Sequence, residues 1–161
     1  MTKIGLLSDT HSWLNPKIYE FFKDCDEIWH AGDIGSDDVA IELAAFKKLR
    51  AVYGNIDDWD IRADFPQFQI FKIEEIKVIM THIGGYPNAY APGIKQLLLN
   101  HSVPSPKKIQ ILILSKCICF IERYYSVHEC IALSLVVIIL FNCNQEFVGS
   151  IPFTFYLKVY W

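Results

Sequence analysis

Oxygen and imidazole side chains that could bind divalent metal ions recur in the first half of the chain, and each follows a short apolar run. The candidate ligands are Asp9, His11, Asp33, Asn55 and His82. Carboxylate, amide and imidazole donors without cysteine suit Mn²⁺, Fe²⁺, Co²⁺, Ni²⁺ or Zn²⁺ and disfavour an iron–sulfur cluster. An Asp between two sets of ligands can bridge two ions about 3.5–4 Å apart, which together activate a hydroxide for in-line attack at phosphorus. This chemistry predicts two divalent ions and hydrolysis of a phosphate ester, and it leaves the choice among these metals open.

The position of these residues favours a metal site over a simpler interpretation. An isolated Asp-x-His pair is more often a turn or a helix cap than a pair of ligands. Here each candidate lies at the end of a predicted strand: Lys3–Ser8, Glu27–Trp29, Leu49–Tyr53 or Lys77–Met80. Asp9, Asp33, Asn55 and His82 follow one another at intervals of 24, 22 and 27 residues, close to the roughly 30 residues of a strand–helix–strand unit. The ligands should therefore gather at one edge of an α/β sheet.

Helices and a hairpin are predicted between and after these strands. Asn15-Pro16 begins a helix with Ile18, Phe21 and Phe22 at helical spacing. Ser36 caps a second helix, whose predicted buried face is Val39, Ala40, Leu43, Ala44 and Phe46. A hairpin turn at Glu74-Glu75 joins Phe68–Ile73 to Lys77–Met80, and Pro92–Leu99 is predicted to be helical.

The ordered segments Asp9-Thr10-His11, Gly32-Asp33, Gly54-Asn55 and Thr81-His82 resemble the motifs of calcineurin-like metallophosphoesterases, most closely the small single-domain phosphodiesterases of bacteria and archaea. The resemblance covers residues 1–99. It implies a sandwich of two mixed β-sheets flanked by helices, with a small phosphate ester as substrate. It also implies that Asp9 and His11 bind the first ion, that Asp33 bridges, and that Asn55 and His82 bind the second. Asp33 and Asn55 would be the catalytic residues, with Asn55 near the substrate phosphate.

The sequence departs from this family in its second half. The family closes its site with Gly-His-Thr/Ser-His, and no such tetrapeptide occurs here. His101, in Asn100-His101-Ser102-Val103, lies too soon after the predicted helix, and His128 is more simply a surface or core residue. The C-terminal part of the fold would then be incomplete. An impaired scaffold or binding protein on the same fold therefore stands as the alternative to an active phosphoesterase.

Composition places the chain among globular proteins. Its 161 residues suit a single domain over 1–161, and 52% are hydrophobic. The net charge of −3 and the lack of a basic run give no nucleic-acid-binding patch. No signal-peptide pattern precedes the first strand, so we expect a cytoplasmic protein with no membrane association and reduced cysteines. Monomer and homo-oligomer are both compatible with the sequence.

Composition changes near residue 100. Residues 1–100 hold 15 of 18 acidic residues and 7 of 8 glycines, whereas residues 101–161 hold 4 of 5 cysteines and no Asp. Apolar runs in the tail suit strands or a buried helix: Ile109–Leu114, Cys117–Ile121, Ile131–Phe141 and Ile151–Tyr160. The run at 130–141 is shorter than the roughly 20 residues that span a bilayer. A sharper hypothesis is that the tail results from out-of-frame translation of an AT-rich gene. The gene sequence would test it, because a shifted reading frame should then encode the missing Gly-His-Ser-His.

Other conspicuous residues have simpler interpretations. Core or rim packing is expected for Trp13, Trp29 and Trp59 rather than a substrate pocket. His30 is either a support for the Asp33 loop or an ordinary buried histidine. The acidic group Asp57, Asp58 and Asp60 is predicted to form a solvated loop, with Asp57 a weaker candidate for supporting the site. Cys117-x-Cys119 lacks the usual zinc spacing.

Overall fold

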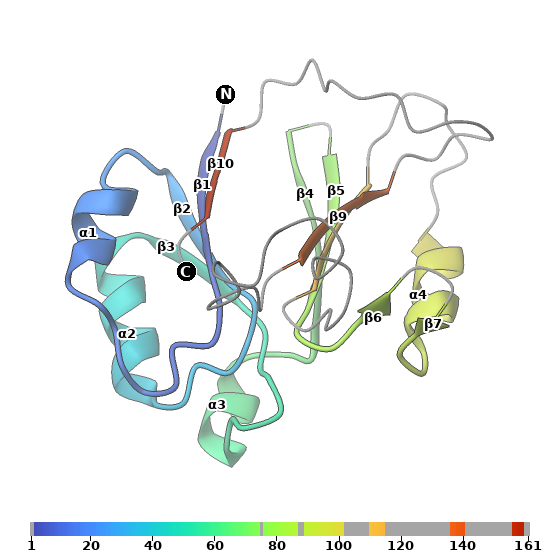
Figure 1. The fold of residues 1–161 in the computed structure, drawn as a ribbon, viewed down its shortest axis with the longest axis horizontal. Helices are drawn as coiled ribbons and strands as arrows, with labels where there is room; N and C mark the ends of the chain where they lie inside the picture. The colour runs from blue at the N-terminus through green and yellow to red at the C-terminus, as the bar shows by residue number, and fades with distance from the viewer. Residues whose placement is uncertain are drawn as a thin grey trace, which may run out of the picture.

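The computed structural model describes residues 2–74, 76–86, 89–101, 110–114, 136–140 and 156–159. Two four-stranded sheets lie face to face, with helices on their outer sides (Figure 1). The helices are α1 (Lys17–Phe22), α2 (Asp37–Phe46), α3 (Trp59–Asp64) and α4 (Ile94–His101). The strands are β1 (Lys3–Leu7), β2 (Glu27–His30), β3 (Lys48–Ala51), β4 (Phe68–Ile73), β5 (Ile76–Thr81), β6 (Gly85–Tyr86), β7 (Ala89–Tyr90), β8 (Gln110–Leu114), β9 (Val136–Leu140) and β10 (Tyr156–Val159). The predicted α/β sandwich flanked by helices is confirmed.

The first sheet has the order β10-β1-β2-β3, and all of its pairings are parallel. Strands β1 and β2 are buried on both faces, including Glu27 and His30 at the ends of β2; only Lys3 at the start of β1 is exposed. One face packs on α1 and α2 through a core that includes Leu7, Phe22 and Leu43. The other face meets the second sheet, where the rings of Trp29 and Phe71 make an edge-to-face contact at 5.0 Å.

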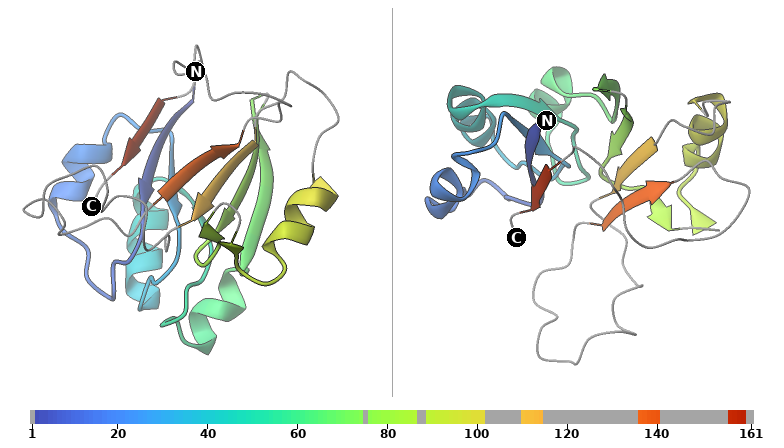
Figure 2. Two further views of the ribbon diagram at one scale, coloured as in Figure 1. Left: turned by 45° about the vertical axis from the view of Figure 1, so that its right-hand side comes forward. Right: turned by 90° about the horizontal axis from the view of Figure 1, so that it is seen from above.

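The second sheet has the order β4-β5-β8-β9 and mixes both strand directions. The predicted hairpin is confirmed, since β4 and β5 pair antiparallel across the turn at Glu74. On its outer face α4 buries Ile94 against Ile79 of β5. Figure 2 shows α4 beside this sheet, on the far side from α1 and α2.

Three strands from the tail of the chain are part of these sheets: β8 and β9 in the second and β10 in the first. β8 pairs parallel with β5 and antiparallel with β9, and β10 pairs parallel with β1 at the edge of the first sheet. At 110–114, 136–140 and 156–159 the apolar runs therefore form strands rather than a buried helix. The run at 117–121, His128 and the four tail cysteines lie outside the described residues. None of the helices in the described part of the chain has the length and apolar character needed to cross a bilayer.

Three details differ from the sequence predictions. β3 begins and ends earlier than Leu49–Tyr53, because Val52 to Gly54 already form the loop toward the site. Ala44 is exposed, since the buried face of α2 is restricted to Val39, Ala40 and Leu43. The predicted acidic loop is wrong for Asp60, which lies within α3. Asp58 is exposed as predicted, and it also caps α3 by accepting a hydrogen bond from the Ile61 amide.

Candidate metal centre

The loops that leave β1 and β2 lie side by side at one edge of the first sheet. The amides of Asp9, His11 and Ser12 donate to the carbonyls of Gly32, Asp33 and Ile34 at 2.9–3.1 Å. These bonds extend the pairing of two parallel strands beyond their ends. Asp9 and Asp33, which are 24 residues apart in sequence, are thereby fixed next to one another, as the strand-end argument predicts.

Four of the five predicted ligands come together here. One ligand atom each from Asp9, Asp33 and His82 lies within 4.8 Å of the other two. The Nε2 atom of His11 lies 3.8 Å from Oδ1 of Asp9 and 3.9 Å from Oδ2 of Asp33. Asp33 is fully buried, whereas the His11 side chain is 54% exposed. A buried carboxylate therefore sits at the centre of the group, and an exposed imidazole lies at its rim.

The orientation of His82 fits a cation. Its Nδ1 lies 2.8 Å from the carbonyl oxygen of Ala31, which can only accept, so Nδ1 carries the proton. When Nε2 carries no proton, its lone pair faces Oδ1 of Asp33, 3.1 Å away. Two such acceptors at this distance favour a positive charge, and the anchored Nδ1–H is the arrangement common among metal-binding histidines. The donor set of this structure therefore suits a divalent ion.

The backbone is strained where these residues lie. Asp9, His11, Ser12 and Asp33 all have positive φ angles, of 58°, 47°, 66° and 56°. Each such non-glycine residue costs about 1–3 kcal/mol, so the surrounding structure must hold it in place. Strain of this kind concentrates at functional sites, and here it falls on three of the candidate ligands.

Two glycines let the ligands approach the backbone. A Cβ on Gly54 would lie 2.0 Å from Oδ1 and 2.4 Å from the amide nitrogen of Asp33. A Cβ on Gly32, whose φ is +98°, would lie 2.7 Å from the ring of His82. Both positions therefore require glycine if Asp33 and His82 are to lie where they do.

Asp57 ties the loops together, and the predicted solvated environment is wrong for it. Its side chain is buried, with Oδ1 accepting from the Gly35 amide and Oδ2 from the Gly54 amide, each at 2.7 Å. One carboxylate thus joins the loop after β2 to the loop after β3. In the sequence, the signal was the position of Asp57 three residues behind Gly54, where a side chain can turn back onto its own loop.

His30 supports the same loops from inside the sheet. Its Nδ1 accepts from the Gly32 amide at 3.2 Å, so the proton lies on Nε2, which donates to the Thr10 hydroxyl at 3.0 Å. That hydroxyl donates in turn to the carbonyl of Ile34 at 2.9 Å. Burial lowers the pKa of His30 to about 3, so the ring is neutral at physiological pH. Of its two predicted roles, the support of the Asp33 loop fits these bonds.

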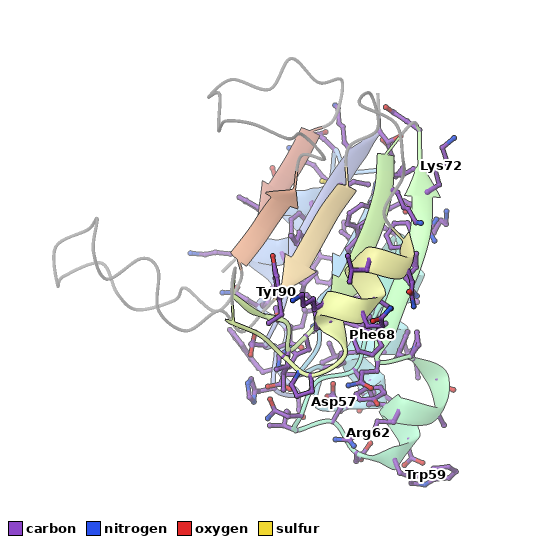
Figure 3. All side chains as sticks on the ribbon, turned by 90° about the vertical axis from the view of Figure 1, so that its right-hand side faces the viewer. Asp57, Trp59, Arg62, Phe68, Lys72 and Tyr90 are labelled. Carbon is purple, nitrogen blue, oxygen red and sulfur yellow. The ribbon has the colours of Figure 1, made fainter. Side chains whose placement is uncertain are left out.

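Asn55 follows Gly54 in an exposed loop next to Asp33. Its carbonyl accepts from Nη2 of Arg62 at 3.2 Å, and Nε of Arg62 donates to the carbonyl of Asp57 at 2.7 Å. Arg62 also stacks on Tyr53 at 5.0 Å. Figure 3 shows Asp57 and Arg62 together at this end of the molecule, with Trp59 directed outward from α3. The loop is therefore anchored by its backbone, and a contact from the Asn55 amide to a metal stays a prediction.

The other residues singled out in the sequence include His101 and the tryptophans. His101 is the last residue of α4, on the outer face of the second sheet. Of Trp13, Trp29 and Trp59, only Trp29 is a fully buried core residue, whereas the other two are exposed.

Comparisons with known proteins agree with this geometry. Residues 2–103 match the calcineurin-like phosphoesterase superfamily domain. A probable metallophosphoesterase of Methanothermobacter thermautotrophicus is 31% identical over 99 residues, which are 58% of this chain and 57% of that protein. A probable metallophosphoesterase of Methanocaldococcus jannaschii is 31% identical over 84 residues, 49% of this chain and 42% of that protein. This chain thus spans about half the length of the relatives it matches.

A similar fold occurs in the crystal structure of Chaetomium thermophilum Vps29. The TM-score is 0.50 at 13% identity, over 60% of this chain and 57% of that one. At this identity the likeness concerns the fold alone.

Proposed function

The chain belongs to the calcineurin-like phosphoesterase superfamily, and from this premise we propose that it hydrolyses a small phosphodiester or phosphomonoester at the centre formed by Asp9, His11, Asp33 and His82. The observation that carries the proposal is the approach of the ligand atoms of Asp9, Asp33 and His82 to within 4.8 Å. These residues come from strand ends in both sheets, so the fold itself assembles the group.

We further propose that the centre holds two divalent ions, Mn²⁺ first among them. Asp9 and His11 would bind one ion, His82 and Asn55 the other, and Asp33 both. When bound, such ions polarise the phosphate and lower the pKa of water so that hydroxide forms near neutral pH. Oxygen and imidazole donors suit Mn²⁺ and equally accommodate Fe²⁺, Co²⁺, Ni²⁺ or Zn²⁺.

The residues of the chain set the charge and the geometry. Two carboxylates close together would repel a phosphate, so an anionic substrate requires cations at this point. Asp33, fully buried and accepting from the Ile56 amide at 3.1 Å, cannot swing away from its position. His82 is held from behind by the Ala31 carbonyl. Such prepositioning removes much of the cost of ordering ligands when a cation binds.

Metal content and turnover test the proposal together. After chelation and reconstitution with Mn²⁺, we expect bound metal and hydrolysis of an aryl phosphodiester, with an aryl monoester assayed beside it. Asp33→Asn should lose both, because an amide is neutral and its nitrogen cannot act as a ligand. Asp38→Asn, at an exposed acid in the first turn of α2, is the matched control and should keep both. Equal behaviour of the two variants would contradict the proposal.

A catalytically impaired scaffold on the same fold is the second candidate. The observation in its favour is the lack of Gly-His-Thr/Ser-His in the sequence, which removes one imidazole for each ion. Loss of a direct ligand should weaken metal affinity by more than the roughly 10–100-fold typical of a supporting residue. A folded protein that binds neither Mn²⁺ nor Zn²⁺ and has no turnover would favour the scaffold.

A further inference from the structure

A small cavity of about 110 Å³ opens beside Asp9, between the exit of β1 and helix α1. Its apolar lining comes from Leu7, Trp13, Leu14 and Ile18, and Asp9 itself forms part of the wall. Ser8, Thr10 and Asn15 complete the lining, so the cavity has an apolar part and a polar part. Asp9 belongs both to the cavity wall and to the candidate metal centre, so a phosphate held at that centre would lie next to the cavity.

The walls of this recess are well fixed. Leu7 and Ile18 are each only 1% exposed and belong to the core beneath α1. A hydrogen bond closes the turn that carries Trp13: the Trp13 amide donates to the Thr10 carbonyl at 2.9 Å. At the mouth the Trp13 side chain is 65% exposed, so its ring is available to a ligand.

We propose that this cavity receives the alcohol part of the phosphate ester, and that this part is a single aromatic ring seated against Trp13. The inference rests on the proposed function, since the metal centre would hold the phosphate. In hydrolysis the oxygen of water bonds to phosphorus, the P–O bond to the alcohol breaks, and the alcohol leaves with a proton. The cavity would hold that alcohol before and during the cleavage.

Size and charge define the class of alcohol. A dry cavity of roughly 150 Å³ holds benzene, so a recess of about 110 Å³ that is open to solvent accommodates one ring with its edge outside. Aromatic contacts with Trp13 favour a ring over an alkyl chain. The residues that line the cavity include no lysine or arginine, so a second anionic group would find no basic partner there. Phenol-like leaving groups therefore fit the cavity better than alcohols that carry further phosphates.

Binding of ligands that cannot be hydrolysed tests this inference apart from turnover. Benzylphosphonate mimics a phenyl phosphate, ethylphosphonate mimics a methyl phosphate, and phenol is the ring alone. Ligand-detected NMR and titrations with Mn²⁺ present would compare the wild type with Trp13→Ala. The matched control is Trp59→Ala, whose side chain is 76% exposed but lies outside the cavity on α3.

We expect the wild type to bind benzylphosphonate several-fold more tightly than ethylphosphonate. Trp13→Ala should weaken benzylphosphonate by about 2–12-fold, the range that an aromatic pair contributes, and should leave ethylphosphonate unchanged. Trp59→Ala should change neither. If Trp13→Ala weakens both phosphonates equally, or neither, the inference is overturned. Phenol binding that depends on Trp13, without binding of either phosphonate, would overturn the proposed function while leaving a ring-binding cavity.

Discussion

Substituting Gly54 by Ala should damage the metal centre although it replaces none of the candidate ligands. The added Cβ would lie 2.4 Å from the Asp33 amide nitrogen, about 1 Å short of the 3.4 Å at which ordinary contact begins. It would also lie 2.0 Å from Oδ1 of Asp33. Because one of these atoms is backbone in a fully buried loop, the strain cannot be relieved by a side-chain rotation alone.

The expected magnitudes follow from that overlap. Overpacking of a well-packed site costs about 1–3 kcal/mol of unfolding free energy. A shift of about 1 Å at Asp33 should weaken metal affinity by the roughly 10–100-fold seen when a supporting contact is lost. Displacement by that distance can also lower turnover by about 100-fold.

Gly93→Ala is the matched control. Gly93 has a φ of +84°, and nothing lies within 4 Å of a Cβ built there. Its substitution should cost about 1–2 kcal/mol through backbone strain alone. Urea unfolding and calorimetric titration with Mn²⁺ would be run on both variants. The reasoning is refuted if Gly54→Ala binds Mn²⁺ with wild-type affinity, or if Gly93→Ala weakens binding equally.

Three further predictions concern the supports of the centre. Asp57→Asn should lower the unfolding free energy by about 1–3 kcal/mol, because the side-chain nitrogen of Asn cannot accept a hydrogen bond and so one of the two bonds from the Gly35 and Gly54 backbone amides is lost. Urea denaturation measures this, and an unchanged midpoint would contradict it. The pKa of His30 is about 3 in the folded protein and about 6.5 in the unfolded chain. Below pH 6.5 only the unfolded chain binds a proton at this residue, so the unfolding free energy should fall as the pH drops. The slope from His30 approaches about 1.4 kcal/mol per pH unit, and His30→Asn should be flatter between pH 6.5 and 5; identical slopes would be evidence against this burial. Finally, Mn²⁺ at 100 times its dissociation constant should stabilise the wild type by about 2.7 kcal/mol, an effect that thermal unfolding should detect and that Asp33→Asn should abolish.

Sequence reasoning succeeded where one residue type has one physical role. The segments Ile4–Leu7 and Glu27–Trp29 were predicted to be strands, and the polar residues directly behind them were predicted to lie at the sheet edge. The hairpin at Glu74 followed from two apolar runs around an acidic turn. These arguments depend on local sequence and on the shared direction of parallel strands, which is why they brought Asp9 and Asp33 together correctly. His82 also joins them, but it follows β5 of the second sheet, whereas the sequence argument expected one edge of a single sheet.

It failed where a side chain has two possible environments. Asp57, Asp58 and Asp60 look alike in sequence, yet Asp57 is buried, whereas Asp58 and Asp60 are exposed as predicted. Only the tertiary structure shows that two amides point at Asp57. The same applies to Ala44, since a small apolar residue at helical spacing suits a core or a surface equally well. Tail runs such as 136–140 were ambiguous because short apolar segments fit a strand and a buried helix alike.

The origin of the ligands has a consequence for the whole molecule. Asp33 follows β2 in one layer, and His82 follows β5 in the other. An ion bound by both residues would connect the two sheets. Part of its binding free energy would then stabilise the packing of one sheet on the other. Substitutions far from the centre that weaken this packing, such as loss of the Trp29–Phe71 contact, should therefore lower the affinity for the ion. Conversely, removal of the ion should weaken the packing between the two sheets.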